Sequence, residues 1–323
     1  MSDNIKETVV NEDDLFTFVS NDTIESEKII APRYSYWRSV FRVFFRKKAN
    51  WFVLGLLALL LLCIFVIPLF CDYDPYENVT NATMFNKNPV EAMKATGGFS
   101  FKWILGAGKL GNSIFYGIWS SARTSLLLAM ICAAINMAVG IAMGAVWGYS
   151  KTVDKVMLVI YSIIANIPTI LLLSVLVYIV GSGFWSFVFA LTITGWLGIA
   201  YFFRTQTMII RDREYSLASR CLGTPIPRII SKNILPFLTS VIVTLLATEL
   251  PLYISMEVYL SFIGIGLSAT VPSLGRMIQE AQDAFMTFPW AFWAPVAIAA
   301  LLTIILYVLG QNLADATDPR THM

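Results

Sequence analysis

Residues 51–70 read WFVLGLLALLLLCIFVIPLF, a run of twenty residues without a charged side chain. An α-helix rises about 1.5 Å per residue, so a run of this length crosses roughly 30 Å of hydrocarbon. Apolar runs of similar length follow near residues 126–149, 156–180, 184–203, 237–262 and 290–311. The pattern predicts an all-α polytopic membrane protein with six transmembrane helices.

The composition supports this prediction and excludes several other classes of protein. Of the 323 residues, 57% are hydrophobic and 14% are charged, and the mean hydropathy of +0.68 lies outside the range of soluble domains. A net charge of +2 indicates no nucleic-acid partner. Cys63, Cys71, Cys132 and Cys221 form no CxxC pair and the single histidine is His322, so we expect no metal site.

The positions of the basic residues predict the orientation in the plasma membrane, because cytoplasmic loops retain Lys and Arg close to the spans. Six cluster just before the first span: Arg33, Arg38, Arg42, Arg46, Lys47 and Lys48. The connections after the second and fourth spans are also basic, whereas residues 181–183 carry no charge and residues 264–289 hold one basic residue. The segment 71–122 holds four lysines, but long loops follow the rule poorly. We therefore expect both termini in the cytoplasm.

The chain before and after the first span divides into segments of different character. Residues 1–30 hold eight acidic and two basic side chains, which predicts a flexible acidic cytoplasmic tail over 1–32. Aromatic residues at helical spacing beside an arginine stripe predict an amphipathic helix over 33–50. This helix lies either in the membrane interface or on the flank of the protein. We expect an extracytoplasmic segment at 71–122 and a core at 123–320 that holds five transmembrane helices and a cytoplasmic loop at 204–236.

Four polar side chains are predicted inside the membrane: Glu249, Glu257, Asn136 and Asn166. The two glutamates are eight residues apart and share a helix face, and each should face protein or water because a carboxylate in lipid is costly. Two interpretations remain open. The carboxyl groups serve as a proton relay or as the polar lining of a pathway, or they make interhelical hydrogen bonds, for instance to Asn136 or Asn166.

Small residues and prolines shape the predicted bundle. Gly140, Gly144 and Gly148 recur at every fourth position of the second span, so one face lacks bulk and another helix can approach it closely. Pro168 and Pro251 lie in the middle of spans, where each removes a backbone donor. They act either as hinges or only as bends that shape the bundle.

Residues 213–236 read REYSLASRCLGTPIPRIISKNILP and interrupt the apolar pattern. Residues 214–222 contain no helix breaker and predict a short helix, which Gly223 ends in a left-handed cap. A second short helix can begin after Pro225 and Pro227 and leads into the next span. We call residues 211–236 the elbow, since they predict a helix-turn-helix that projects into the cytosol.

The elbow resembles the cytoplasmic EAA loop of ABC importer permeases, with Gly223 at the glycine position and Ile234-Leu235-Pro236 at the close. Leu217-Ala218-Ser219 stand at the Glu-Ala-Ala positions, so the glutamate is absent. The resemblance implies that the elbow couples the protein to a cytoplasmic ATPase. The implied coupling residues are Arg213, Glu214, Tyr215, Ala218, Ser219, Arg220, Leu222, Gly223 and Arg228. Four arginines of the elbow either pair with acidic residues of that ATPase or only reflect the tendency of cytoplasmic loops to retain Lys and Arg. They are Arg211, Arg213, Arg220 and Arg228.

The wider chain resembles the C-type permease of oligopeptide and dipeptide ABC importers over roughly residues 33–320. The similarity rests on Tyr36-Trp37-Arg38, Asp72-Tyr73-Asp74-Pro75, residues 121–126, Arg213-Glu214-Tyr215, residues 260–266, Pro272-Ser273-Leu274-Gly275 and residues 315–320. It implies the type I importer permease fold and a non-catalytic subunit without cofactors of its own. It also implies a second permease subunit, two cytoplasmic ATPases that bind ATP, an extracytoplasmic peptide-binding protein and a lipid bilayer as partners.

Other functions make different demands on the sequence. An ion-coupled secondary transporter would show inverted repeats and more ionisable residues near mid-membrane, and only the two glutamates are present. An intramembrane hydrolase would need a base that a chain without an internal histidine does not offer. An ABC importer permease for another solute and a purely structural membrane subunit remain alternatives to a peptide permease.

Overall fold

The computed structural model describes residues 36–71, 73–78 and 81–317, so the predicted tail at 1–32 lies outside the described residues. Contacts divide the chain into a unit Met1–Ser39 and a unit Val40–Met323. Of the first unit only the first turn of α1 is described, and the paragraphs below concern the second. The α-helices are α1 Tyr36–Arg46, α2 Lys48–Phe70, α3 Pro89–Ala95, α4 Ile114–Tyr149, α5 Lys151–Ala165, α6 Thr169–Val180, α7 Phe184–Arg211, α8 Glu214–Cys221, α9 Ile226–Ile229, α10 Thr239–Phe262, α11 Leu274–Ala281 and α12 Pro289–Thr317.

The long apolar helices confirm a helical membrane protein. Within the described residues, five helical runs are long and apolar enough to cross a membrane, and the count rises to six if α5 and α6 form one broken span. The predicted third span is bent by 87° between these two helices. Pro168 lies at the break, because proline cannot donate the helical hydrogen bond and disfavours helix in the residue before it. The backbone of Pro168 itself is extended, with ψ 121°. Pro251, in contrast, remains within α10.

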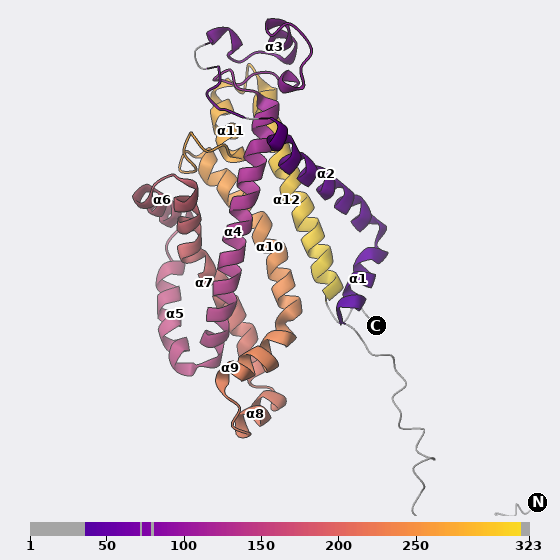
Figure 1. The fold of residues 1–323 in the computed structure, drawn as a ribbon. Coiled ribbons are helices and arrows are strands. Elements are labelled where there is room, and N and C mark those ends of the chain that lie inside the picture. The colour runs from indigo at the N-terminus through magenta and orange to yellow at the C-terminus, as the bar shows by residue number, and fades with distance from the viewer. Residues whose placement is uncertain (1–35, 72, 79–80, 318–323) are drawn as a thin grey trace, which may run out of the picture. The chain divides into compact units, whose positions relative to one another are not determined.

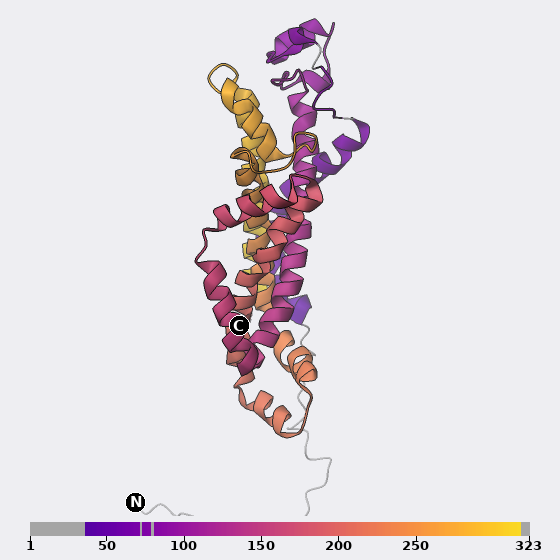
Figure 2. The same ribbon diagram turned by 90° about the vertical axis from the view of Figure 1, so that its left-hand side faces the viewer.

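The helices of this unit pack side by side around α4. α4 runs along α7, α10 and α2, and α10 also packs against α12 (Figures 1 and 2). One buried side chain from each of five helices illustrates the shared core: Ile64, Leu126, Phe187, Ile254 and Leu302. The elbow helices α8 and α9 lie at one end of the bundle, whereas α3 and α11 lie at the opposite end (Figure 1).

The glycine face of α4 packs against α7, as the sequence predicts. A Cβ atom at Gly144 would lie 2.6 Å from the carbonyl oxygen of Ala200, and one at Gly148 would lie 2.5 Å from that of Arg204. Both distances are far below van der Waals contact, so only glycine lets the two backbones approach this closely.

Gly144→Ala is therefore expected to destabilise the protein by about 2 kcal/mol, since the added methyl group forces α4 and α7 apart. Thermal unfolding in detergent measures the effect. Gly55→Ala is the matched control, because a Cβ at Gly55 on α2 meets no atom within 4 Å. Equal melting temperatures for the two variants would contradict close packing of α4 on α7.

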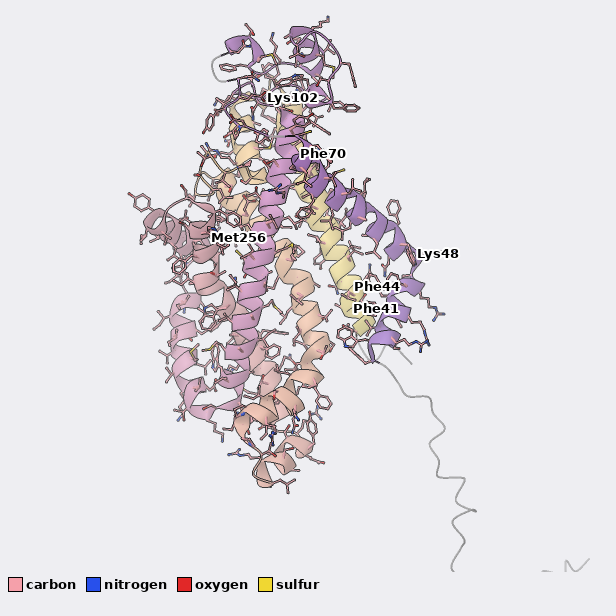
Figure 3. All side chains as sticks on the ribbon, viewed as in Figure 1. Phe41, Phe44, Lys48, Phe70, Lys102 and Met256 are labelled. Atoms are coloured by element: carbon pink, nitrogen blue, oxygen red, sulfur yellow. The ribbon has the colours of Figure 1, made fainter. Side chains whose placement is uncertain are left out.

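The part of α1 within this unit has a buried side, as the flank alternative predicts, and an exposed side. Val40 and Phe44 are buried, whereas Phe41 and Phe45 are exposed (Figure 3). Asn50 donates from Nδ2 to the Phe44 carbonyl oxygen at 2.7 Å and fixes the join between α1 and α2. One side of this helix thus packs on the protein while the neighbouring side is exposed.

The start of α2 lies beside the end of α12. The Lys47 ammonium group donates to Asn312 Oδ1 at 3.3 Å and lies 3.7 Å from Asp315 Oδ2. Both ends of the span-forming region therefore lie at one end of the bundle.

The segment between α2 and α4 has a small core of its own, formed by Met84, Ala92, Trp103 and Ala107. Tyr73 is held there by Asn112, which donates from Nδ2 to the phenol oxygen at 2.7 Å. Burial raises the pKa of Tyr73 to about 12, so the phenol stays neutral in the physiological range. Lys109 bonds Asp283 at 2.7 Å and ties this segment to the stretch before α12.

Candidate functional site

The first arm of the elbow is a short helix that ends in a left-handed glycine. After α8, Gly223 adopts φ +75°. Its N–H donates to the Arg220 carbonyl at 3.0 Å, and Thr224 N–H donates to the Ser219 carbonyl at 3.1 Å. These two bonds are those of a Schellman cap. A residue with a Cβ atom pays a steric penalty at this φ, so the predicted helix end and its glycine are confirmed.

The second arm begins between the two prolines rather than after them, with Pro227 in the first turn of α9, and it is anchored in the bundle. α9 continues through a π-helical turn at Ile230–Ile234 and a 3₁₀ turn at Leu235–Leu238 into α10. Ile229 and Ile234 are fully buried. They pack in a small apolar cluster with Phe203 of α7, which fixes this arm on the bundle.

Two contacts hold the arms together. Asn233 donates from Nδ2 to Ser219 Oγ at 2.7 Å, and the rings of Tyr215 and Phe237 lie 5.1 Å apart. Ser216 of α8 is buried. The elbow therefore has a defined bend.

The surface of the elbow combines apolar and basic side chains. Leu222 is 85% exposed, and Leu217 and Ile226 are about half exposed. Most of the other predicted coupling residues are also exposed: Arg213, Glu214, Tyr215, Ala218, Arg220, Gly223 and Arg228. Ser219 is partly buried. The structure thus brings the predicted residues onto one projecting segment.

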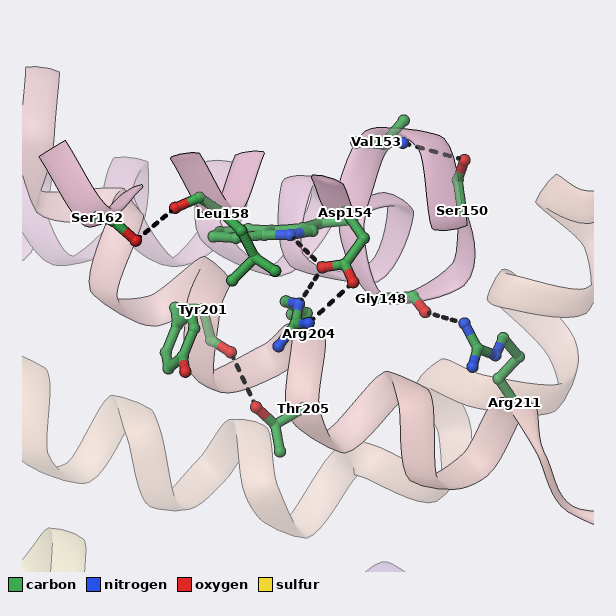
Figure 4. Close-up of polar contacts among 11 residues, drawn as sticks. Gly148, Ser150, Val153, Asp154, Leu158, Ser162, Tyr201, Arg204, Thr205 and Arg211 are labelled. Atoms are coloured by element: carbon green, nitrogen blue, oxygen red, sulfur yellow. Dashed lines mark hydrogen bonds and ion pairs between the residues drawn. The ribbon is translucent and has the colours of Figure 1, made fainter. Parts of the chain in front are cut away.

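Arg211 differs from the other elbow arginines because it points into the bundle. Its Nη1 donates to the Gly148 carbonyl at the end of α4 at 2.9 Å (Figure 4). Its Nε and Nη2 donate to Asp212 at 2.8 and 3.0 Å. The guanidinium hydrogen bonds hold the pKa of Asp212 below its usual range, so the pair is charged at neutral pH. Arg211 joins α7 to α4 and is occupied within the chain.

Sequence reasoning missed a polar clamp that joins α4, α5 and α7 (Figure 4). Asp154 of α5 accepts from Trp147 Nε1 of α4 at 2.8 Å and from Arg204 Nη2 of α7 at 2.9 Å. The side chains of Asp154 and Arg204 are only 20% and 13% exposed. The signal was a lone acid near the start of an apolar helix, which alone does not identify its partner.

Asp154→Asn is expected to destabilise the protein by about 2 kcal/mol, because the charged Arg204 loses its carboxylate partner in a partly buried site. Thermal unfolding in detergent measures the change. Lys155→Gln removes an exposed charge from the next residue of α5 and should leave the melting temperature unchanged. A melting temperature of Asp154→Asn equal to that of Lys155→Gln would show that the clamp contributes nothing.

Glu257 is fully buried where α4, α10 and α11 meet. Ser125 of α4 donates to its Oε2 at 2.7 Å, and Ser261 donates to its Oε1 at 2.9 Å. Ser125 Oγ also accepts from Leu274 N–H of α11 at 3.2 Å. This glutamate therefore links three helices, in line with the interhelical interpretation.

The predicted partners of the glutamates were Asn136 and Asn166, and for Glu257 that prediction is wrong. Asn136 donates to the Tyr253 hydroxyl at 2.6 Å and to the Leu191 carbonyl at 3.3 Å, one helical turn away from Glu257. Asn166 lies exposed after α5 and bonds back to Ser162 of that helix. Serines satisfy the carboxylate in their place.

Glu249 lies in a cavity of about 410 Å³ between α5, α6, α7 and α10. Most of the wall is apolar, with polar atoms from Thr194 of α7 and from Tyr161 and Tyr253. Glu249 is only partly buried and is the one charged residue among those that line the cavity. The bend between α5 and α6 forms part of the wall, so Pro168 helps to shape this space.

Comparison with known proteins places these features in a family. Residues 137–323 match the model described as binding-protein-dependent transport system inner membrane component, and residues 35–89 match the N-terminal TM domain of oligopeptide transport permease C. The oligopeptide transport system permease protein AmiD of Streptococcus pneumoniae is 45% identical over 95% of this chain and 97% of its own length.

More distant relatives show the same pattern. The oligopeptide transport system permease protein OppC of Bacillus subtilis is 29% identical over 92% of this chain and 93% of its own length. The dipeptide transport system permease protein DppC of the same organism is 30% identical over 95% of this chain and 93% of its own length. With its several membrane helices, the chain belongs to the binding-protein-dependent transport system inner membrane components and is a multi-pass, non-catalytic permease subunit.

Proposed function

We propose that this chain forms half of the translocation path of an ATP-driven importer of oligopeptides. The observation that carries the proposal is the 45% identity, over nearly the whole chain, to a relative named as an oligopeptide permease. The other half of the path is a second permease subunit, cargo arrives from an extracytoplasmic peptide-binding protein, and two cytoplasmic ATPases hydrolyse ATP.

The elbow is the proposed ATPase contact. Its exposed leucines and arginines surround a short helix whose bend is fixed by the glycine cap. A short helix of this kind suits a groove on a partner, and a fixed bend passes rigid-body motion to the helices that carry it. Arg213, Arg220 and Arg228 are available for acidic partner residues, whereas Arg211 is occupied inside the chain.

Uptake of a radiolabelled pentapeptide tests the function. A strain that lacks the chromosomal gene should take up the peptide only when it is complemented with this chain. ATP depletion should stop uptake, and an uncoupler that collapses ion gradients at constant ATP should leave the initial rate unchanged. Loss of uptake with the uncoupler alone would indicate an ion-coupled carrier. Normal peptide uptake without the chain would mean that the cargo is another solute.

A native cysteine tests the elbow contact. Cys221 lies exposed on the elbow, whereas Cys132 is buried and Cys63 and Cys71 are partly buried. A heterobifunctional maleimide reagent on Cys221 should crosslink a protein that peptide mass mapping identifies as an ABC ATPase. Cys221→Ser should lose that product. If the assembled transporter gives no ATPase adduct, the elbow is not the contact.

The same cysteine reports the orientation. With the elbow and both termini in the cytoplasm, a membrane-impermeant maleimide should label Cys221 in inside-out vesicles stripped of peripheral subunits and not in right-side-out vesicles. The meeting of α2 and α12 through Lys47 and Asp315 supports this arrangement, because it puts both ends of the span-forming region on one side. Labelling of Cys221 in right-side-out vesicles would reverse the topology.

A further inference from the structure

We infer that the cavity between α5, α6, α7 and α10 receives an ammonium group of the cargo, with Glu249 as the opposite charge. The inference rests on the proposed function, since it names the part of the cargo that this site binds. The volume of about 410 Å³ lies within the range of small-molecule sites. The space therefore suits one end or one side chain of a peptide.

The chemistry of the walls selects a cation with an apolar body. A carboxylate in a mostly apolar space gains most from a positive charge, because the interaction is strong where water is scarce. Tyr161 and Tyr253 lie on the same walls, and aromatic rings of this kind attract cations. A metal ion is a poor fit, because no group of three metal-ligating side chains occurs in the described part of the chain.

Tyr253 on the cavity wall is positioned by contacts with neighbouring helices. The Tyr253 hydroxyl accepts from Asn136 at 2.6 Å and keeps its own proton to donate. Glu249 lies four residues earlier on the same face of α10. A Cβ atom at Gly195 of α7 would lie 2.6 Å from Asn136 Nδ2 and 2.9 Å from the Tyr253 oxygen. Three helices therefore position the phenol beside the carboxylate, and the carboxylate has a partly exposed side for a ligand.

Every unmodified peptide carries an ammonium group at its N-terminus, and lysine supplies a second one. Both sources share the chemistry that Glu249 recognises. The test uses four pentapeptides of one apolar sequence: free N-terminus, free N-terminus with one lysine, acetylated N-terminus with one lysine, and acetylated N-terminus without lysine. Initial uptake rates are measured with the complete transporter in proteoliposomes.

Glu249→Gln should lower kcat/KM about tenfold for each cationic peptide that the wild type carries, whereas Glu249→Asp should retain most of it. The acetylated peptide without lysine should change less than twofold. The two peptides with a single cation distinguish the N-terminus from the lysine side chain. Met256→Leu, which alters the cavity wall without a change of charge, should change kcat/KM by the same factor for all four peptides (Figure 3).

Several results would overturn the inference while the proposed function stands. An equal loss for all four peptides would assign Glu249 to assembly, for instance to a basic residue of the second permease subunit. Equal rates for Glu249→Gln and Glu249→Asp would show that the charge has no role. If the wild type carries only cationic peptides, the uptake rates of Glu249→Gln and Glu249→Asp for those peptides decide whether the charge at position 249 is needed. Failure of wild-type uptake for every peptide would instead reject the proposed function.

Discussion

Gly223→Val should abolish peptide uptake while the protein still reaches the membrane in normal amounts. A Cβ atom at this position meets nothing within 4 Å, so the substitution creates no clash with the rest of the chain. The backbone, however, has φ +75°, which costs an ordinary side chain about 1–2 kcal/mol and a β-branched one more. The cap should open and α8 should leave its position, with uptake and copurification of the ATPase each reduced at least tenfold.

Two matched variants separate backbone conformation from added bulk. Gly223→Asn should retain part of the activity, because asparagine tolerates the left-handed region better than other residues with a side chain. Gly55→Val adds the same side chain on α2, where space is open and φ is not in the left-handed region, and should leave uptake intact. Full uptake by Gly223→Val would disprove the coupling role of the elbow.

Glu257→Ala should destabilise the protein by about 4 kcal/mol, the largest stability effect expected here. The substitution leaves a void and removes the acceptor of the Ser125 and Ser261 hydroxyl groups in a site without water access. The contact of α11 with α4 through Ser125 should loosen with it. Thermal unfolding in detergent and the yield of folded protein measure the loss.

Glu257→Gln is the comparison variant for this site. Glutamine fills the same volume and keeps one acceptor oxygen, so its cost should be about half that of alanine or less. If alanine and glutamine destabilise the protein equally, volume and hydrogen bonding at this site do not determine its stability.

Features with local signals could be predicted from the sequence. The spans follow from apolar runs, and the end of α8 follows from a glycine after a short helix without breakers. The glycine spacing in α4 likewise predicts a face without bulk. Each of these signals lies within one segment, so no knowledge of a partner helix is needed to interpret it.

Features that depend on neighbours could not be predicted. α4 begins at Ile114, about twelve residues before the predicted span, because Ser121 and Ser125 are buried against protein and need no apolar run. Ser125, which donates to Glu257, and the asparagine that holds Tyr253 come from a helix far from α10 in the sequence. The cavity wall combines α5, α6, α7 and α10, and no single segment contains its pattern.

The contact between α4 and α7 limits how the protein can move. Their backbones touch along the glycine face, Arg211 fastens α7 to the end of α4, and Asp154 adds α5 to the pair. A force applied where α7 leaves the bundle cannot slide one of these helices past another, so α4, α5 and α7 tilt together as one rigid block. α10 is tied to this block as well, because Ser125 and Asn136 of α4 bond Glu257 and Tyr253 of α10, so Glu249 moves with the block when it tilts.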